Sequence, residues 1–233
     1  MPTNAHFRGF PKESVAFLKE LADNNNKTWF ADHKGDFEKH LMEPARDFVY
    51  EMGNRIKEIS PKVIADPKVD RSIFRLYRDT RFSKDKTPYK THLGIFFWEG
   101  TRPKMECPGY YFHLEPPDLM LAAGMHCFPK SLLGRYRDWV VHPLHGPELA
   151  KAVGEVTAAG DYQVGGVHYK KTPRGYDANH ENAEFLLHDG LYAAFHTQIP
   201  KELHSKDLLE YCLIRFRDMS PLHEWLVHMT AEE

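Results

Sequence analysis

The segment GYYFHLEPPDLMLAAGMHC, residues 109–127, constrains the fold more than any other part of the chain. Apolar and polar side chains alternate on both sides of the turn PPD, which is the pattern of a half-buried β-hairpin. If Leu114 faces Leu119 across the turn, one face of the hairpin is apolar throughout. The small residues on the opposite face leave room for a polar pocket, whose floor would carry Tyr111, His113, Glu115, Met120, Ala122, Gly124 and His126.

Helical periodicity flanks this hairpin on both sides, because apolar residues recur there at intervals of three, four or seven. Asp32 is expected to cap a helix, and Pro44 to start or kink one. Two separate helices, SKDLLEYCLIRFRDM and PLHEWLVHM, are predicted to close the chain, after a loop at residues 160–180 and a strand LYAAFHTQI.

These patterns predict a single α+β domain over residues 1–233, with a central, mainly antiparallel sheet flanked by helices. The helical N-terminal part is expected to cover about residues 10–60 and the sheet core about residues 72–127. The helical C-terminal part is expected to cover about residues 129–230.

The composition is that of an ordinary globular protein, with 42% hydrophobic and 27% charged residues. The longest apolar run, LMLAAGM, is far shorter than the roughly 20 residues that span a bilayer. The first residues lack a secretory pattern, and three cysteines without a CxxC spacing favour a reducing compartment. We therefore expect a cytoplasmic protein without membrane contact, whose oligomeric state the sequence leaves open.

The stretch FRLYRDTRFSKDKTPYK, residues 74–90, is strongly basic in a chain of net charge −2. Residues 70–90 hold seven Lys or Arg against three Asp, a local charge of +4, so the other 212 residues carry −6. Arginines interleaved with large apolar groups favour a strand over residues 71–81, because a helix would mix both kinds on one face. Arginine and lysine side chains suit phosphate or carboxylate. The predicted anion-binding wall is Arg75, Arg78, Arg81, Lys84, Lys86 and Lys90.

Other interpretations of this basic stretch stay open. The side chains could bind a nucleic acid or an acidic protein partner in an open groove. They could also be structural, solvated or tied up in ion pairs with Asp79, Asp85 and Glu115. The local character of the positive charge, with a pI near 6.7, favours a defined small anion over a long polyanion.

Two further groups bear on ligand binding. The late loop HYKKTPRGYDANH adds Arg174 and Tyr176, which could grip nucleotide phosphates and stack bases, or simply anchor the loop on the sheet. His113, Glu115 and His126 are residue types that ligate metals, but His126 lies too far along its strand to share an ion, so no metal site is predicted. The sequence has no nucleophile, phosphate-loop or dinucleotide motif, and it leaves any cofactor unknown.

The motif FRLYRDTRFSKDKTPYKTH resembles the signature of the microbial family known as domain of unknown function 2461. The resemblance extends over nearly the whole chain through NNNKTWFADHK, PGYYFHLEP, TPRGYDANH and PLHEWL, with HEN in the late loop where the family pattern has His followed by Pro. It implies a single-domain protein and supplies no catalytic residue, because the family has no settled activity.

Together these observations predict a pocket that binds a phosphorylated small molecule or nucleotide, with Tyr111 among its binding residues. If the protein turns over a substrate, which the sequence does not decide, the least strained reaction is hydrolysis or transfer at a phosphoester. His113, Glu115 and Asp79 are then the candidate catalytic residues, with a carboxylate or imidazole as general acid or base. The alternative is a binding module without enzymatic activity that uses the same basic residues.

Overall fold

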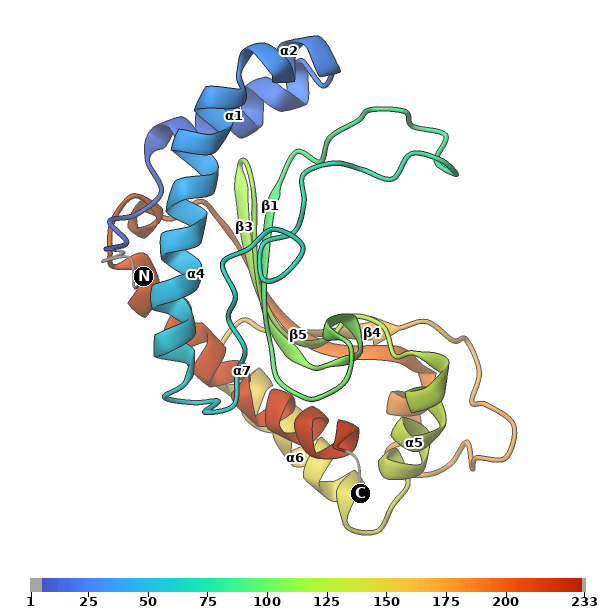
Figure 1. Ribbon diagram of the computed structural model, residues 1–233. Coiled ribbons are helices and arrows are strands. Elements are labelled where there is room, and N and C mark those ends of the chain that lie inside the picture. Colours follow the sequence, from blue (N-terminus) through green and yellow to red (C-terminus); the bar gives the residue numbers. More distant parts are fainter. Residues whose placement is uncertain (1–5, 232–233) are drawn as a thin grey trace. The chain divides into compact units, whose positions relative to one another are not determined.

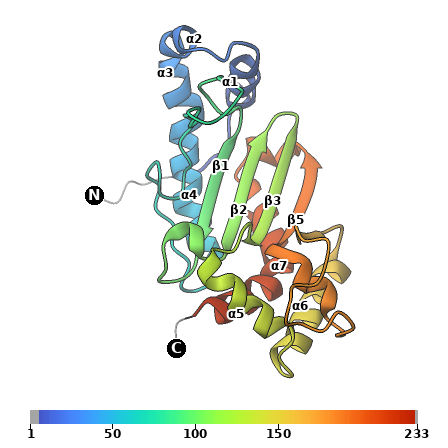
Figure 2. The same cartoon turned by 90° about the vertical axis from the view of Figure 1, so that its right-hand side faces the viewer.

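The computed structural model describes residues 6–231, in which helices accompany a five-stranded antiparallel sheet of order β1-β2-β3-β5-β4 (Figures 1 and 2). The strands are β1 (Leu93–Trp98), β2 (Gly109–Glu115), β3 (Asp118–Met125), β4 (Gln163–Val167) and β5 (His188–Gln198). The predicted α+β class is confirmed. The chain divides into two compact units, each described here by itself, and cooperative folding as one domain stays a prediction.

The first unit comprises residues 6–97, 111–120 and 196–214. It contains the N-terminal helices and most of β1 and β2. Its helical segments are α1 (Lys12–Asp23), α2 (Lys27–Asp32), α3 (Lys34–Asp36), the π-helix η1 (Phe37–Met42), α4 (Glu43–Ile56), the 3-10 helix η4 (Lys201–His204) and the start of α7 (Leu208–Thr230).

Local signals explain where the first helices begin and end. The NNN sequence separates α1 from α2, because the Asn26 side chain caps α2 by accepting a hydrogen bond from the Trp29 amide at 2.9 Å. Asp32, expected to cap the next helix, instead is the last residue of α2. Pro44 lies near the start of α4, which follows η1 without a break, and the His40 carbonyl four residues earlier accepts a hydrogen bond from the Ser14 hydroxyl instead.

The core of this unit forms where α4 meets β2. The α4 residues Phe48, Met52 and Ile56 are fully buried at helical spacing. The Phe48 ring lies 4.9 Å from Phe112 of β2, and Phe112 stacks on Phe10 at 5.8 Å. This packing occupies one face of β2, so the side chains of the other face are left for a site.

The strand predicted for residues 71–81 is wrong. Only isolated bridges form there: Ile73 pairs with Val69 and with Ile95, and Tyr77 pairs with Tyr89. Ile73 and Leu76 are buried three residues apart, which breaks the period of two that a strand requires. Residues 76–90 instead form one long projecting loop, drawn in teal and green in Figure 1. We call this loop the basic arm.

The base of the basic arm is held by hydrogen bonds. The Arg78 amide donates to the Pro88 carbonyl at 2.9 Å, and the Lys90 amide donates to the Leu76 carbonyl at 2.8 Å. The Asn25 side chain, between α1 and α2, makes two hydrogen bonds with the Tyr89 backbone, at 2.9 and 3.0 Å.

The second unit comprises residues 98–110, 121–195 and 215–231. Its helical segments are η2 (Lys104–Glu106), α5 (Lys130–Val140), α6 (His145–Ala159), the 3-10 helix η3 (Ala183–Leu187) and most of α7. The predicted loop at 160–180 contains β4, which pairs antiparallel with β5. The sheet is therefore not confined to the predicted residues 72–127.

The two predicted C-terminal helices form one continuous helix, α7, with Pro221 inside it. Proline has no N–H to donate to the carbonyl four residues earlier, which here is that of Arg217. The Ser220 hydroxyl donates to this carbonyl at 2.9 Å and so replaces the missing bond. Within residues 6–231, none of the helices combines the length and apolarity that crossing a membrane requires.

Candidate functional site

The polar face of β2 carries Tyr111, His113 and Glu115, as the alternation predicts. Phe112 and Leu114 between them are fully buried on the other face. The Tyr111 hydroxyl lies 2.9 Å from His113 Nδ1, and His113 Nε2 lies 3.3 Å from Glu115 Oε2. The period of the strand therefore builds a chain of hydrogen bonds along one face.

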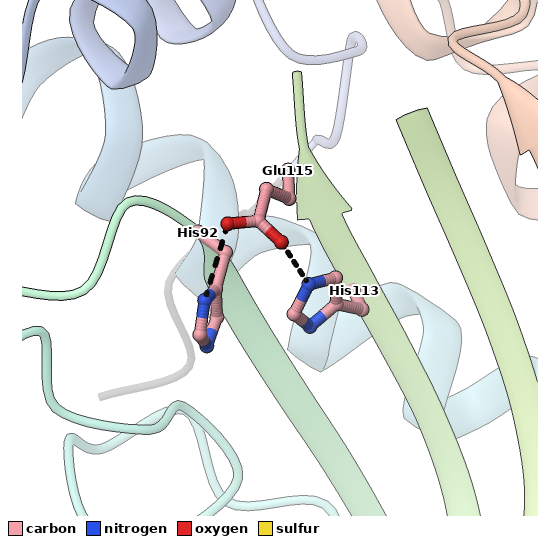
Figure 3. Close-up of side chains that lie close together, drawn as sticks. All are labelled: His92, His113 and Glu115. Carbon is pink, nitrogen blue, oxygen red and sulfur yellow. Dashed lines mark hydrogen bonds and ion pairs between the residues drawn. The ribbon is translucent and has the colours of Figure 1, made fainter. Parts of the chain in front are cut away.

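Two residues that precede β1 extend this chain. Thr91 Oγ1 donates to Glu115 Oε1 at 3.0 Å, and His92 Nδ1 lies 4.0 Å from the same oxygen. The His92 and His113 rings are 4.3 Å apart between centroids, and both side chains point toward Glu115 (Figure 3). β1 and β2 are neighbours in the sheet, so a residue entering β1 reaches the end of β2. We call His92, His113 and Glu115 the histidine–glutamate cluster.

Burial and hydrogen bonding set the protonation of this cluster. Burial, with the nearby His113, lowers the pKa of His92 to about 4, so its ring is neutral near pH 7. Burial raises the pKa of Glu115, but hydrogen bonds from His113 and Thr91 outweigh this and hold the pKa below its usual value. Burial raises the pKa of Tyr111 to about 12, so this phenol keeps its proton. Near pH 7 the cluster thus offers an ionised carboxylate next to a neutral imidazole.

His113 and Glu115 of the cluster line a pocket of about 710 Å³ in the first unit. This volume falls within the range typical of small-molecule sites. One wall comes from α1 and another from the turn between β2 and β3. The lining residues are Leu18, Lys19, Ala22, Asp23, Thr91, His113, Glu115, Pro116, Pro117, Asp118, Met120 and His196.

The pocket lining is acidic. Its charged side chains are Lys19 against Asp23, Glu115 and Asp118, a balance of −2 with neutral histidines. Such a lining attracts cations more than anions. In the described part of the chain, none of the six basic residues of the predicted wall lines the pocket, and their part in ligand binding stays a prediction.

One of these six residues, Lys90, nevertheless lies near the cluster. Lys90 Nζ lies 5.5 Å from the centroid of the Phe74 ring, and that ring lies 6.0 Å from Tyr111. Burial, followed by the charge of Arg75, lowers the pKa of Lys90. The Lys90 charge in turn contributes to the lowered pKa of His92. Lys90 therefore adds positive potential next to the cluster, and Arg75 lies close enough to Lys90 to affect its pKa.

The remaining basic residues lie along the arm. Arg78 donates hydrogen bonds to Asp85 and Thr87, and Lys86 Nζ donates to the Thr80 carbonyl at 2.9 Å. The bond from Arg78 is the main cause that lowers the pKa of Asp85 to about 2. Lys84 is exposed.

Asp79, a candidate catalytic residue from the sequence, also lies on the arm. It pairs with Arg81 at 2.7 Å, and this hydrogen bond lowers the Asp79 pKa. Asp79 is not among the residues that line the pocket, so its predicted catalytic role gains no support there. The alternative in which Asp79 and Asp85 hold arginines in place matches the observed pairs, whereas the hydrogen bonds found for Glu115 come from Thr91 and His113.

Arg174 and Tyr176 belong to the second unit. Arg174 is exposed, and the Tyr176 hydroxyl donates to Asp138 at 2.7 Å. Burial and this bond raise the pKa of Tyr176 to about 12. His126, also in the second unit, lies next to Tyr192 with ring centroids 5.7 Å apart. A part for Arg174 and Tyr176 in ligand binding stays a prediction.

The chain belongs to the family described as conserved hypothetical protein (DUF2461), whose family model matches residues 13–225. This confirms the resemblance that the sequence motifs indicated. Searches of curated proteins and of solved structures gave no match. The family description names no activity, so the function has to be argued from the site.

Proposed function

We propose that this member of the DUF2461 family binds a phosphorylated small molecule or nucleotide in the pocket beside His113 and Glu115, and acts on it as a phosphoester hydrolase or transferase. The observation that carries the proposal is the hydrogen-bonded pair His113–Glu115 on the wall of a pocket of about 710 Å³. An imidazole that is hydrogen-bonded to a carboxylate in a cleft is a common general acid or base in enzymes.

The neighbouring side chains would orient the imidazole and supply positive charge for the phosphoryl group. The Tyr111 hydroxyl lies 2.9 Å from His113 Nδ1 and Glu115 Oε2 lies 3.3 Å from Nε2, so the imidazole exchanges its proton through the Glu115 carboxylate, which lines the pocket. In hydrolysis, the water oxygen bonds to phosphorus as the ester P–O bond breaks, and the water's proton passes through the imidazole to the departing oxygen. Lys19 in the lining, with Lys90 beside the cluster, provides positive charge for the phosphoryl oxygens.

Thermal unfolding against nucleotides, sugar phosphates and inorganic phosphate tests this proposal, followed by phosphate release from any ligand that stabilises the protein. A ligand at 100 times its Kd stabilises the native state by about 2.7 kcal/mol. We expect His113→Gln and Glu115→Gln to abolish the stabilisation. The matched control is His168→Gln, which breaks another histidine–carboxylate pair, with Asp189, in the second unit. The proposal fails if no phosphorylated compound stabilises the wild type, or if the control behaves like the site variants.

A second candidate function rests on the exposed tip of the basic arm. Phe82 is 95% exposed, and Arg81 beside it has a side chain that is 77% exposed. Exposed aromatic and basic side chains together suit single-stranded nucleic acid, because bases stack on the ring and phosphates pair with the cations. Binding of an oligonucleotide that weakens steeply with salt, and that Phe82→Ala and Lys84→Ala reduce, would favour this function.

A further inference from the structure

We propose that the histidine–glutamate cluster binds a divalent transition-metal ion, with His92, His113 and Glu115 as its three protein ligands. Each residue offers one ligand atom, and these atoms all lie within 4.8 Å of one another (Figure 3). Two imidazoles and one carboxylate form a ligand set that suits zinc, iron or manganese. The proposal concerns the same pocket as the proposed function but stands on this geometry.

The distances within the cluster are close to those that a bound metal requires. Metal–ligand bonds of about 2.1 Å in tetrahedral geometry place ligand atoms about 3.4 Å apart. His113 Nε2 and Glu115 Oε2 are 3.3 Å apart, and His92 Nδ1 and Glu115 Oε1 are 4.0 Å apart. These two distances run to different oxygens of the Glu115 carboxylate, and no two ligand atoms are more than 4.8 Å apart, so side-chain rotations that close a gap of up to about 1.4 Å bring the three ligands onto one ion.

The residues around the cluster orient its ligands as outer partners of a metal site do. With Nε2 on the metal, His113 Nδ1–H would donate to the Tyr111 oxygen, which lies 2.9 Å away. Thr91 holds the Glu115 carboxylate from the other side at 3.0 Å. Gly94 leaves room for this arrangement, since a Cβ there would lie 2.7 Å from the Tyr111 hydroxyl.

The charge of the pocket lining indicates what a bound ion would do there. The lining balance of −2 disfavours a phosphorylated ligand, whereas a divalent cation would neutralise it and supply a positive centre for phosphoryl oxygens. Three protein ligands leave at least one coordination position for water or substrate, which is the pattern of catalytic rather than structural sites. In the loaded protein, His113 and Glu115 would be ligands, and a metal-bound water would be the group that loses a proton. Only this step rests on the proposed function.

Metal binding can be measured without any substrate. Protein stripped with a chelator is titrated with ZnCl₂, MnCl₂ and CoCl₂ by calorimetry, and the visible absorption of Co²⁺ reports its coordination. We expect one ion per chain, loss of measurable binding in His92→Ala and His113→Ala, and about 10- to 100-fold weaker binding in Tyr111→Phe. Circular dichroism and thermal unfolding confirm that each variant is folded.

The matched control is His145→Ala. His145 also stacks on a histidine, His142, with ring centroids 4.6 Å apart, and it lies 3.0 Å from Glu148. We expect this substitution to leave the affinity unchanged. A folded wild type that binds none of the three metals overturns the proposal, as does binding that survives both His92→Ala and His113→Ala.

The outcome for the metal and the outcome for the phosphorylated ligand are separable. Metal binding that depends on the cluster, without stabilisation by any phosphorylated compound, supports the metal site and refutes the proposed function. Conversely, a phosphorylated compound that binds equally well to chelator-treated protein and to His92→Ala refutes the metal site and keeps the proposed function.

Discussion

The Asn25 side chain makes two of the hydrogen bonds at the base of the basic arm, so its replacement by alanine should loosen the arm's base. Its amide nitrogen donates to the Tyr89 carbonyl at 2.9 Å, and its oxygen accepts from the Tyr89 amide at 3.0 Å. Tyr89 is 3% exposed and stacks on Phe30 with centroids 4.2 Å apart. Water therefore cannot easily replace the lost partners, and both backbone groups are left without their hydrogen bonds.

The magnitude follows from these two bonds. Each contributes about 1 kcal/mol net, and a buried group left unsatisfied costs about 1–3 kcal/mol, so we expect Asn25→Ala to destabilise the arm's base by about 2–3 kcal/mol. Asn25→Asp keeps the acceptor for the Tyr89 amide but loses the donor, so its effect should be about half as large. Asn24→Ala is the control, because Asn24 is exposed and its side chain bonds only within its own helix end, to the Glu20 carbonyl.

Amide hydrogen exchange locates the effect. If the arm opens locally, a loss of 2 kcal/mol accelerates exchange of the Tyr89 and Lys90 amides about 30-fold, while core amides of α4 keep their rates. Urea unfolding of the same variants reports any global change. Equal exchange rates in Asn25→Ala and Asn24→Ala would refute the reasoning, because the two hydrogen bonds would then contribute nothing to the arm.

Three other outcomes are expected. Ser220→Ala should destabilise the native state by about 1 kcal/mol in urea unfolding, because the Arg217 carbonyl loses its hydrogen bond. The double variant Ser220→Ala with Pro221→Ala should keep the wild-type stability, because the restored amide at position 221 can donate to the Arg217 carbonyl. The Asp85 carboxyl should titrate by NMR with a midpoint near 2, and Arg78→Gln should return this midpoint toward 4. The stability that the ionised Asp85 adds is present above the ordinary carboxyl pKa near 4 and is lost as the pH falls through 2. Gly94→Ala should weaken metal binding about 10- to 100-fold while the protein stays folded, because its Cβ displaces the Tyr111 hydroxyl.

The hairpin is the part of the fold that the sequence predicted best. A strand has a period of two, so the alternation in GYYFHLE was enough to place His113 and Glu115 on one face and Phe112 on the other. Helix periodicity likewise predicted the buried face of α4. Both signals are local, and neither depends on which elements become neighbours.

The incorrect predictions concern residues whose spatial neighbours lie far away in the chain, and a single sequence does not show these contacts. His92 joins the cluster because β1 lies beside β2, whereas sequence reasoning tested His126 as the third ligand. The signal that could have found His92 is its position directly before an apolar strand. Residues 71–81 looked like a strand from their alternation, but only isolated bridges form there, and the base of the arm that follows is held by Asn25, 64 residues from Tyr89 in the chain. Pro221 did not end its helix, because the Ser220 hydroxyl replaces the lost bond.

Acidic and basic side chains are separated within the first unit, so the two candidate functions can be distinguished by testing the effects of a chelator and of salt on both ligands. The pocket lining is acidic, while the arm, residues 76–90, carries five basic residues against Asp79 and Asp85. A small phosphorylated ligand in the pocket needs the cation at the cluster to neutralise the acidic lining, so a chelator should abolish its binding. A polyanion on the arm needs no metal, so a chelator should leave its binding unchanged while salt weakens it. If the chelator affects both ligands equally, the metal acts on the fold of the unit rather than on the charge of the pocket.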